Sequence, residues 1–152
     1  MKKVDRLLAD YGSHHRTRGN LVCHAFGITL IVFGVLSLLG RVATPPAGST
    51  AAEWLIAATF LFYLALDLPL ALAILVPVAG LDLLARAVSD WRVGLAAFAA
   101  GWVFQAVGHA RFERNRPAFF RNLVHLMIGP LYLVNEVVKV RRIVPETRGT
   151  HP

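Results

Sequence analysis

The side chains best suited to chemistry lie where one apolar segment, residues 101–120, turns polar. Gln105, His109 and Glu113 follow one another at i, i+4 and i+8, so a helix would place all three on one face. A buried amide in a membrane must be hydrogen-bonded, and ionisable groups at that depth are costly and tend to mark function. The segment therefore predicts a polar site that needs partners from elsewhere in the chain.

Histidine supplies most of the other candidate ligands. The chain has six histidines and one cysteine, Cys23, so neither an internal disulfide nor a thiolate zinc cluster is expected. Several imidazoles without thiolates suit iron, zinc, copper or nickel, and a nearby carboxylate with open coordination positions suits iron(II). His125 could lie near such a site, whereas His151, in the basic tail, is expected to take no part.

The composition indicates an integral membrane protein. Of 152 residues, 56% are hydrophobic and 16% are charged, so a soluble fold of this size would lack the polar surface to cover its apolar side chains. The net charge of +7 comes from basic residues that flank the apolar segments and form no stripe among aromatics, so no nucleic-acid partner is expected. The first apolar run begins only after Asn20 and has no evident cleavage site, so no signal peptide is predicted.

Four apolar stretches are predicted to cross the membrane as helices. The stretch 21–39 carries no charge and would be about 28 Å long as a helix, close to the hydrocarbon thickness. The tract 53–86 is too long for one crossing, and Asp67 as an N-cap before Pro69 predicts a tight helical hairpin there. The predicted spans are 21–39, 54–66, 68–85 and 91–108.

The ends of the chain are expected at the membrane interface. Apolar side chains at positions 4, 7, 8 and 11 predict a short amphipathic helix that Gly12-Ser13 ends, and Asn20 is a candidate N-cap for the first span. Gly129-Pro130 separates the apolar stretches 123–128 and 131–138, which predicts a broken helix in the interface or against the bundle. The fold class is therefore all-α, an integral membrane bundle of about four transmembrane helices with interfacial terminal helices. Residues 1–152 form one domain, divided into an interfacial segment 1–20, a core 21–108, interfacial helices 109–142 and a tail 143–152.

Basic residues predict the orientation of this bundle and bring the histidines together. Thirteen of the 16 lysines and arginines lie before the first span or after the fourth, so both termini are expected in the cytoplasm. An even number of crossings then places His24, at the start of the first span, on the same side as His109, at the end of the fourth, with His14 and His15 just outside. Singly, each has a simpler interpretation, such as a solvated side chain, a bond to a helix carbonyl or a helix cap. Their convergence favours a metal site.

Three motifs also run along the chain in the order found in one family of membrane enzymes. The motifs are Tyr11-x2-His14-His15-x4-Asn20-x3-His24-x2-Gly27, then Gly101-Trp102-x2-Gln105-x2-Gly108-His109-x2-Phe112-Glu113-x3-Pro117-Ala118, then Asn122-Leu123-Val124 followed by Pro130 and Glu136. On these residues, which span nearly the whole chain, the sequence resembles the membrane-embedded iron(II)-dependent dioxygenases of 2-hydroxy fatty acids. That family includes the fungal enzymes of phytosphingosine α-oxidation.

The resemblance implies that the chain cleaves a 2-hydroxy fatty acid with O2 and releases a fatty acid one carbon shorter. The residues that match the motifs imply a metal site at His14, His24 and His109, with His15 next, and catalytic roles for Asn20, Gln105 and Glu113, the last as a ligand or as a residue that orients one. The arginines that could neutralise the substrate carboxylate are Arg16, Arg18, Arg111 or Arg114. The expected cofactor is Fe(II), and the expected partners are the hydroxy acid, O2 and membrane lipid, with a homo-oligomer left open.

Two other classes of function stay open at this point. The histidine pairs could be axial ligands of haem in an electron-transfer membrane protein, or the chain could be a small membrane protein whose histidines bind nothing. Visible absorption distinguishes the haem protein, and metal analysis distinguishes the protein that binds nothing. The small size and the Arg- and Ala-rich sequence predict a bacterial inner membrane location.

Overall fold

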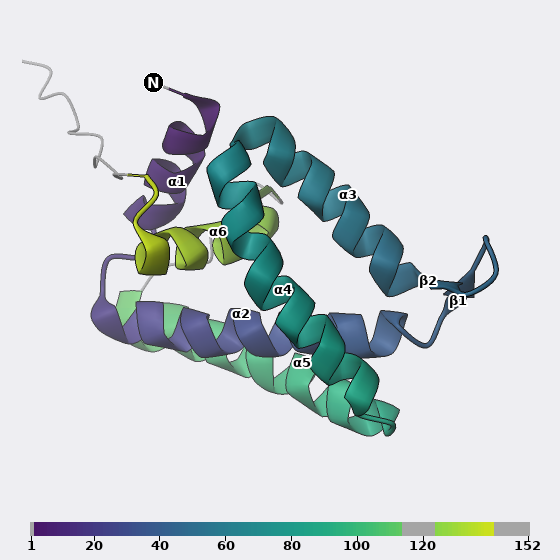
Figure 1. The fold of residues 1–152 in the computed structure, drawn as a ribbon. Coiled ribbons are helices and arrows are strands. Elements are labelled where there is room, and N and C mark those ends of the chain that lie inside the picture. Colours follow the sequence, from purple (N-terminus) through teal and green to yellow (C-terminus); the bar gives the residue numbers. More distant parts are fainter. Residues whose placement is uncertain (1, 114–123, 142–152) are drawn as a thin grey trace, which may run out of the picture.

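The computed structural model describes residues 2–113 and 124–141, and these residues are helical apart from one short hairpin (Figure 1). The elements are α1 (Lys3–Ser13), α2 (Arg18–Leu39), β1 (Ala43–Thr44), β2 (Ser49–Thr50), α3 (Ala51–Leu66), α4 (Leu68–Ala87), α5 (Trp91–Val107), the π-helix η1 (Gly108–Glu113) and α6 (Val124–Val138). The predicted all-α fold class is confirmed. The part of the domain division that falls on residues 114–123 and 142–152 lies outside the described residues.

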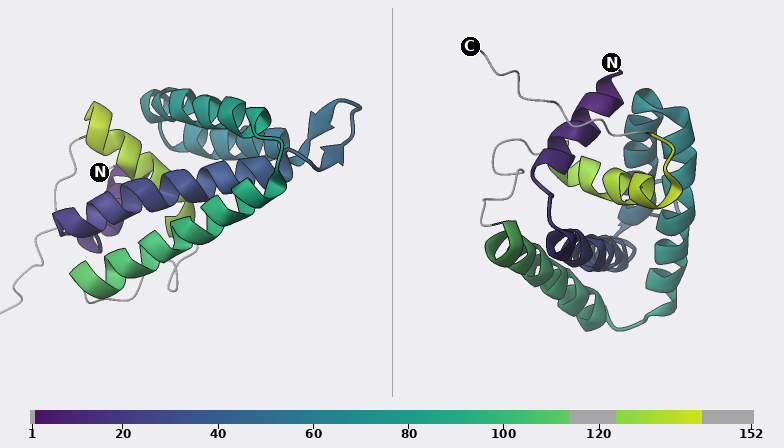
Figure 2. Two further views of the ribbon diagram at one scale, coloured as in Figure 1. Left: turned by 90° about the horizontal axis from the view of Figure 1, so that it is seen from below. Right: turned by 90° about the vertical axis from the view of Figure 1, so that its left-hand side faces the viewer.

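Helices α2 and α5 form an antiparallel pair in which glycines let the two backbones touch (Figure 2). A Cβ added at Gly101 would lie 2.7 Å from the carbonyl oxygen of Gly27, and one at Gly34 would lie 2.6 Å from that of Gly94. Neither helix could carry a larger residue there without moving apart. This close approach brings the start of α2 against the end of α5 and η1, where the predicted site residues lie.

Helices α3 and α4 form the predicted hairpin and lie across the α2–α5 pair (Figure 1). Asp67 is the N-cap of α4, because its carboxylate accepts a hydrogen bond from the Leu70 amide at 3.2 Å, and Pro69 lies in the first turn. The helix continues through Pro77. Among the described residues, α2, α4 and the joined α5–η1 are long and apolar enough to span a membrane. At 16 residues, about 24 Å as a helix, α3 is shorter, and the number of four crossings stays a prediction.

Helices α1 and α6 pack together at one end of the molecule, above α2 (Figures 1 and 2). Val4, Leu8 and Tyr11 of α1 are buried in a core that α6 shares, so the apolar face of α1 covers the bundle. The predicted end at Gly12-Ser13 is confirmed, since α1 ends at Ser13, and Gly12 also makes room for the ring of Tyr132.

Helix α6 is continuous through Gly129-Pro130, so the predicted break is wrong. A proline inside a helix removes one backbone hydrogen bond, here the one to the Leu126 carbonyl, and crowds the preceding turn. Packing against α3 supports the helix at this point, because the Tyr63 hydroxyl donates to the next carbonyl, that of Met127, at 2.6 Å. The lack of Cβ at Gly129 leaves space for the Tyr11 hydroxyl, so this dipeptide is a packing surface.

The outer surface of the bundle is apolar. Large hydrophobic side chains such as Phe26, Leu61 and Val103 are exposed, and at most a third of each spanning helix's apolar window is buried inside the protein. Monomeric soluble proteins rarely expose such extended apolar area. The three long apolar helices therefore indicate a membrane protein.

Candidate metal centre

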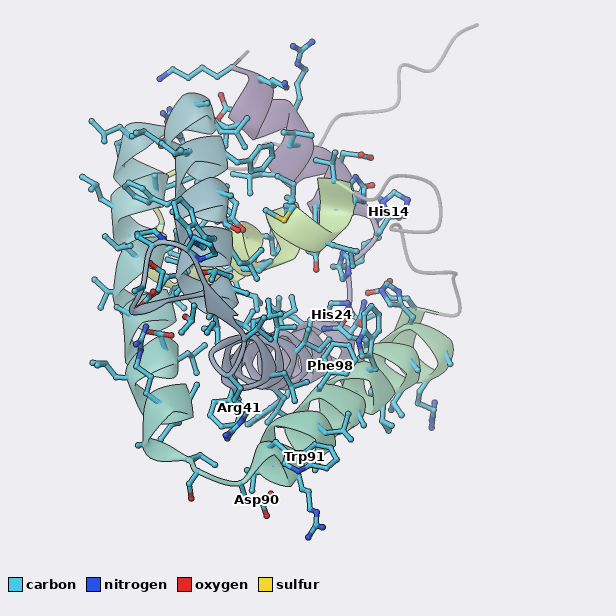
Figure 3. The ribbon with its side chains drawn as sticks, turned by 90° about the vertical axis from the view of Figure 1, so that its right-hand side faces the viewer. His14, His24, Arg41, Asp90, Trp91 and Phe98 are labelled. Carbon is cyan, nitrogen blue, oxygen red and sulfur yellow. The ribbon has the colours of Figure 1, made fainter. Side chains whose placement is uncertain are left out.

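Three histidines from three elements meet in the interior, beside the α2–α5 contact. His15 follows α1, His24 lies in the second turn of α2, and His109 lies in η1 (Figure 3 labels His24). Each offers one ligand atom, and these atoms lie within 4.8 Å of one another. The ring centroids are 4.3 to 5.0 Å apart with the rings nearly perpendicular, and all three side chains are buried.

The hydrogen bonds of His15 and His24 leave the contact between their two Nε2 atoms without a hydrogen. His15 Nδ1 lies 2.7 Å from the Tyr11 carbonyl oxygen, His24 Nδ1 lies 3.0 Å from the Asn20 carbonyl oxygen, and the two Nε2 atoms face each other at 3.0 Å. Carbonyl oxygens only accept, so both Nδ1 atoms must carry hydrogens, and two neutral imidazoles then have no hydrogen for the third contact. Two lone pairs therefore point at one another. A cation at these nitrogens relieves the repulsion. A proton is disfavoured there, since burial lowers the pKa of His15 to about 4, which leaves a metal ion as the suitable cation.

The electrostatics of His15 keep it in the form that a metal requires. Burial lowers the pKa of His15 to about 4, and a positive charge on His109 would lower it further, while the bond to the Tyr11 carbonyl acts in the opposite direction. The ring is therefore neutral near pH 7, and only a neutral imidazole ligates a metal. Tyr11 also stacks its own ring on His15 at 4.0 Å with an interplanar angle of 9°, which fixes the ring's orientation.

Glu113 anchors the site and does not point into it. One carboxylate oxygen, Oε1, accepts hydrogen bonds from the Thr17 amide at 2.8 Å, the Thr17 hydroxyl at 3.1 Å and the Asn20 side-chain amide at 3.2 Å. These bonds tie the end of η1 to the start of α2. In the described residues, Glu113 is not in the group that could share a metal ion.

The π-helical turn gives this anchor its geometry. A π-turn is wider than an α-turn and is common at functional sites. Within η1, His109 is directed at the histidine group and Glu113 at Thr17. Gln105, one turn earlier in α5, is buried near Gly27, where an added Cβ would lie 2.9 Å from its Nε2. The three residues thus all face α2, as their spacing predicts, but do three different things.

Asn20 positions other groups. The predicted N-cap of α2 is wrong, because Thr17 takes that place and its hydroxyl accepts from the Asn20 amide at 3.3 Å. Thr17 is one turn earlier, and its hydroxyl reaches Glu113 as well. Asn20 is fully buried, supplies the carbonyl that orients His24 and donates its side-chain amide to Glu113.

His14 lies outside the group of three, although the sequence favours it over His15. Its Nδ1 faces the Asp10 carbonyl oxygen at 3.0 Å and the Ser13 hydroxyl at 3.1 Å, at the end of α1 (Figure 3). Two adjacent residues at a helix end point in different directions, and the sequence does not say which one points inward. Of the candidate arginines, Arg16, Arg18 and Arg111 are exposed, and Arg114 and His151 lie outside the described residues.

The histidine group lines a cavity that adjoins a second cavity in the apolar interior. A cavity of about 250 Å³ is lined by the three histidines together with Tyr11, Gln105 and His125. A second cavity of about 160 Å³, almost wholly apolar, lies between α2, α3, α4 and α6. The two share the lining residues Ile31, Val32, Val35, Leu126 and Pro130. The cavity at the histidines is therefore adjacent to apolar space within the bundle.

Sequence reasoning missed two contributors to this site, Thr17, which holds Glu113, and Asp10, which bonds to His125. Tyr11 belonged to a motif, but its stacking on His15 was not predicted. A signal existed for Thr17, since a threonine three residues before Asn20 in a polar stretch is a typical N-cap position. No comparable signal marked Asp10, because its partner lies 115 residues away.

The arrangement suits a non-haem metal. Three imidazoles leave coordination positions open for a bidentate ligand and for O2. The 3.0 Å between the Nε2 atoms of His15 and His24 leaves no room for a porphyrin between the rings, so axial ligation of haem by this pair is not favoured.

Comparisons with known proteins give one consistent result. A family model described as "2-hydroxy-palmitic acid dioxygenase Mpo1-like" matches residues 1–141. The chain is similar to the Saccharomyces cerevisiae protein named 2-hydroxy-palmitic acid dioxygenase MPO1, with 32% identity over an alignment 152 positions long that covers 94% of this chain and 84% of the yeast protein. No solved structure matches.

Proposed function

The chain belongs to the Mpo1-like family of 2-hydroxy-palmitic acid dioxygenases, and from this premise we propose that it is an iron(II)-dependent enzyme that shortens 2-hydroxy fatty acids by one carbon. The bond between C1 and C2 of the acid breaks, and C2 is oxidised from an alcohol to a carboxyl group. With one O2 per acid, the balance leaves the shortened fatty acid, CO2 and water.

The observation that carries the proposal is the contact without a hydrogen between the Nε2 atoms of His15 and His24, with His109 beside them. Two imidazole lone pairs held face to face by fixed Nδ1 bonds favour binding of a cation. The residues fit iron(II), which binds imidazoles and retains open positions for a substrate that chelates through its carboxylate and hydroxyl. When bound, the iron supplies a site where O2 and the hydroxy acid meet and exchange electrons.

The other site residues hold this constellation in place. The carbonyls of Tyr11 and Asn20 keep hydrogens on the Nδ1 atoms, so the opposite nitrogens stay available to a metal. Glu113 fastens the helix of His109 to the helix of His24 through Thr17 and Asn20. Gln105 lines the cavity, and we propose that its amide binds a polar group of the substrate.

The two adjoining cavities support the proposal that the substrate has a long acyl chain. The carboxylate and hydroxyl would lie at the histidines, and the acyl chain would pass Ile31 and Val35 into the apolar cavity between α2, α3, α4 and α6. Each buried methylene contributes about 0.8 kcal/mol, so long chains should bind more tightly than short ones. We further propose a bacterial inner membrane location with both termini cytoplasmic, which would place the metal near the cytoplasmic headgroups and the acyl tail within the bilayer.

The test is an incubation of the purified protein with 2-hydroxypalmitic acid, iron(II) and O2, with products identified by mass spectrometry. The expected product is the fatty acid one carbon shorter, formed only when both iron and O2 are present. The 3-hydroxy acid should remain unchanged, because its hydroxyl is on a carbon too far from the bond that breaks. Folded, iron-loaded protein that leaves 2-hydroxy acids of several lengths intact would contradict the proposal.

A further inference from the structure

His125 is buried in the wall of the same cavity as the three histidines, yet it belongs to a separate pair of residues. It lies in the first described turn of α6, and its Nε2 is 2.9 Å from the Asp10 carboxylate of α1. The His125 side chain is only 4% exposed, while that of Asp10 is 55% exposed. These two helices lie side by side in Figure 1, so the pair joins residues far apart in sequence at the wall of the cavity.

The carboxylate determines which ring nitrogen of His125 carries the hydrogen. Since a carboxylate only accepts, the His125 Nε2 donates to Asp10, and the Nδ1 of the neutral ring is left with a lone pair. That Nδ1 is buried and has no hydrogen-bond partner among the described residues. A buried acceptor without a partner is unfavourable, so this nitrogen marks a position where a bound molecule would supply a donor.

We infer that His125 is a specificity-determining residue that accepts a hydrogen bond from the 2-hydroxyl group of the substrate, with Asp10 as its positioning residue; this inference rests on the proposed function. The rings of Tyr11 and His14 both lie edge-on to His125 at 6.0 Å between centroids, and of these two only Tyr11 lines the cavity. The hydroxyl of a 2-hydroxy acid is a donor of the required kind.

The chemistry explains why an unsubstituted fatty acid would be rejected. Its carboxylate has no hydrogen to donate, and a methylene at C2 would leave Nδ1 unsatisfied. A site that bonds a hydroxyl discriminates against the analogue that lacks it, because the buried polar group then stays unpaired. His125 would thus select for the hydroxyl, independently of the three histidines that hold the metal.

The test compares the binding of 2-hydroxypalmitic acid and palmitic acid to the full chain in detergent. Dissociation constants are measured without O2, so that no turnover occurs, on both iron-loaded and metal-free protein. The wild type should prefer the hydroxy acid, and His125→Phe should lower that preference about fivefold in both forms, the value of about one hydrogen bond. Binding of palmitic acid should change by less than about twofold, since the ring's size is kept.

Matched variants separate recognition from simple support of the fold. His125→Asn keeps an acceptor at the δ position and should retain most of the preference, although it loses the bond to Asp10. Asp10→Asn should give an intermediate preference, because the ring can then adopt either tautomer. Asp5→Asn removes the same charge from the same helix without touching His125 and should behave as wild type.

The outcomes distinguish this inference from the proposed function. If His125→Phe folds, retains iron and keeps the wild-type preference, His125 does not read the hydroxyl and the inference is overturned, while the proposed function stands. If the wild type binds both acids equally, the inference is also overturned. A wild-type protein that binds neither acid contradicts the proposed function and the inference with it.

Discussion

Replacing Gly101 with alanine should separate α2 from α5 and weaken the metal site without touching a histidine. The new Cβ would lie 2.7 Å from the Gly27 carbonyl oxygen and 2.6 Å from Ile31 Cγ1. The carbonyl belongs to the helix backbone, so one helix must retreat by about 0.7 Å to reach an ordinary contact. Overpacking of this kind costs about 1 to 3 kcal/mol of unfolding free energy.

The displacement matters for the metal because His109 lies eight residues after Gly101 in the continuous helix α5–η1, about 12 Å along its axis. Metal-ligand distances are set to within about 0.2 Å, so even part of this shift should lower metal affinity about tenfold or more. Denaturant unfolding and titration with iron(II) under anaerobic conditions measure the two effects. Gly80→Ala is the matched control, because a Cβ at Gly80 of α4 meets nothing within 4 Å. If Gly101→Ala equals Gly80→Ala in stability and in iron affinity, helix spacing does not set the site.

Three further predictions test separate parts of the account. Glu113→Gln keeps an oxygen that can accept the same hydrogen bonds, so this variant should retain full metal content; loss of metal from it would show that Glu113 is a ligand. Glu113→Ala should lower the unfolding free energy by about 2 kcal/mol, since it leaves partly buried donors without an acceptor. Thr59→Phe should fill part of the apolar cavity and shift the preference in kcat/KM toward shorter 2-hydroxy acids by about fourfold per excluded methylene, and an unchanged length profile would contradict the acyl path. The pKa of His15 is lowered to about 4 in the folded metal-free protein, whereas the unfolded chain takes up this proton near pH 6.5. The stability of the folded state that depends on a neutral His15 is therefore fully present above pH about 6.5 and is lost as the pH falls toward 4. Unfolding free energy should therefore drop by about 2 kcal/mol between pH 7 and pH 5, and His15→Gln should lack this component; an equal drop in both proteins would show that other groups cause it.

The architecture was largely predictable because hydropathy and caps act locally. The hairpin at Asp67 is confirmed, since an aspartate N-cap followed by proline determines a helix start with little help from the rest of the fold. The expected break at Gly129-Pro130 was wrong for the complementary reason. Whether a proline ends a helix depends on the tertiary contacts around it, and here the Tyr63 hydroxyl, 64 residues away in sequence, donates to the Met127 carbonyl next to the bend-prone turn.

The sequence predicted where in the fold the site lies but not how its side chains are oriented. The distribution of basic residues predicted that the start of α2 and the end of α5 lie on the same side of the membrane. The close glycine contacts between these helices agree with that arrangement. The choice between His14 and His15 depends on how α1 ends and on the stacking of Tyr11, which no spacing rule describes. The π-turn is likewise a tertiary outcome: the spacing predicts the shared face of His109 and Glu113 but not that one lies in the histidine group and the other bonds to Thr17.

The central claim is that His15, His24 and His109 hold a catalytic iron, and the most direct test is the iron content of single-alanine variants. Each protein is reconstituted with iron(II) without O2, desalted and analysed for metal per folded chain. The wild type and His14→Ala should retain about one iron, and His15→Ala, His24→Ala and His109→Ala should retain almost none. Full iron in a folded His15→Ala or His109→Ala protein would contradict the account.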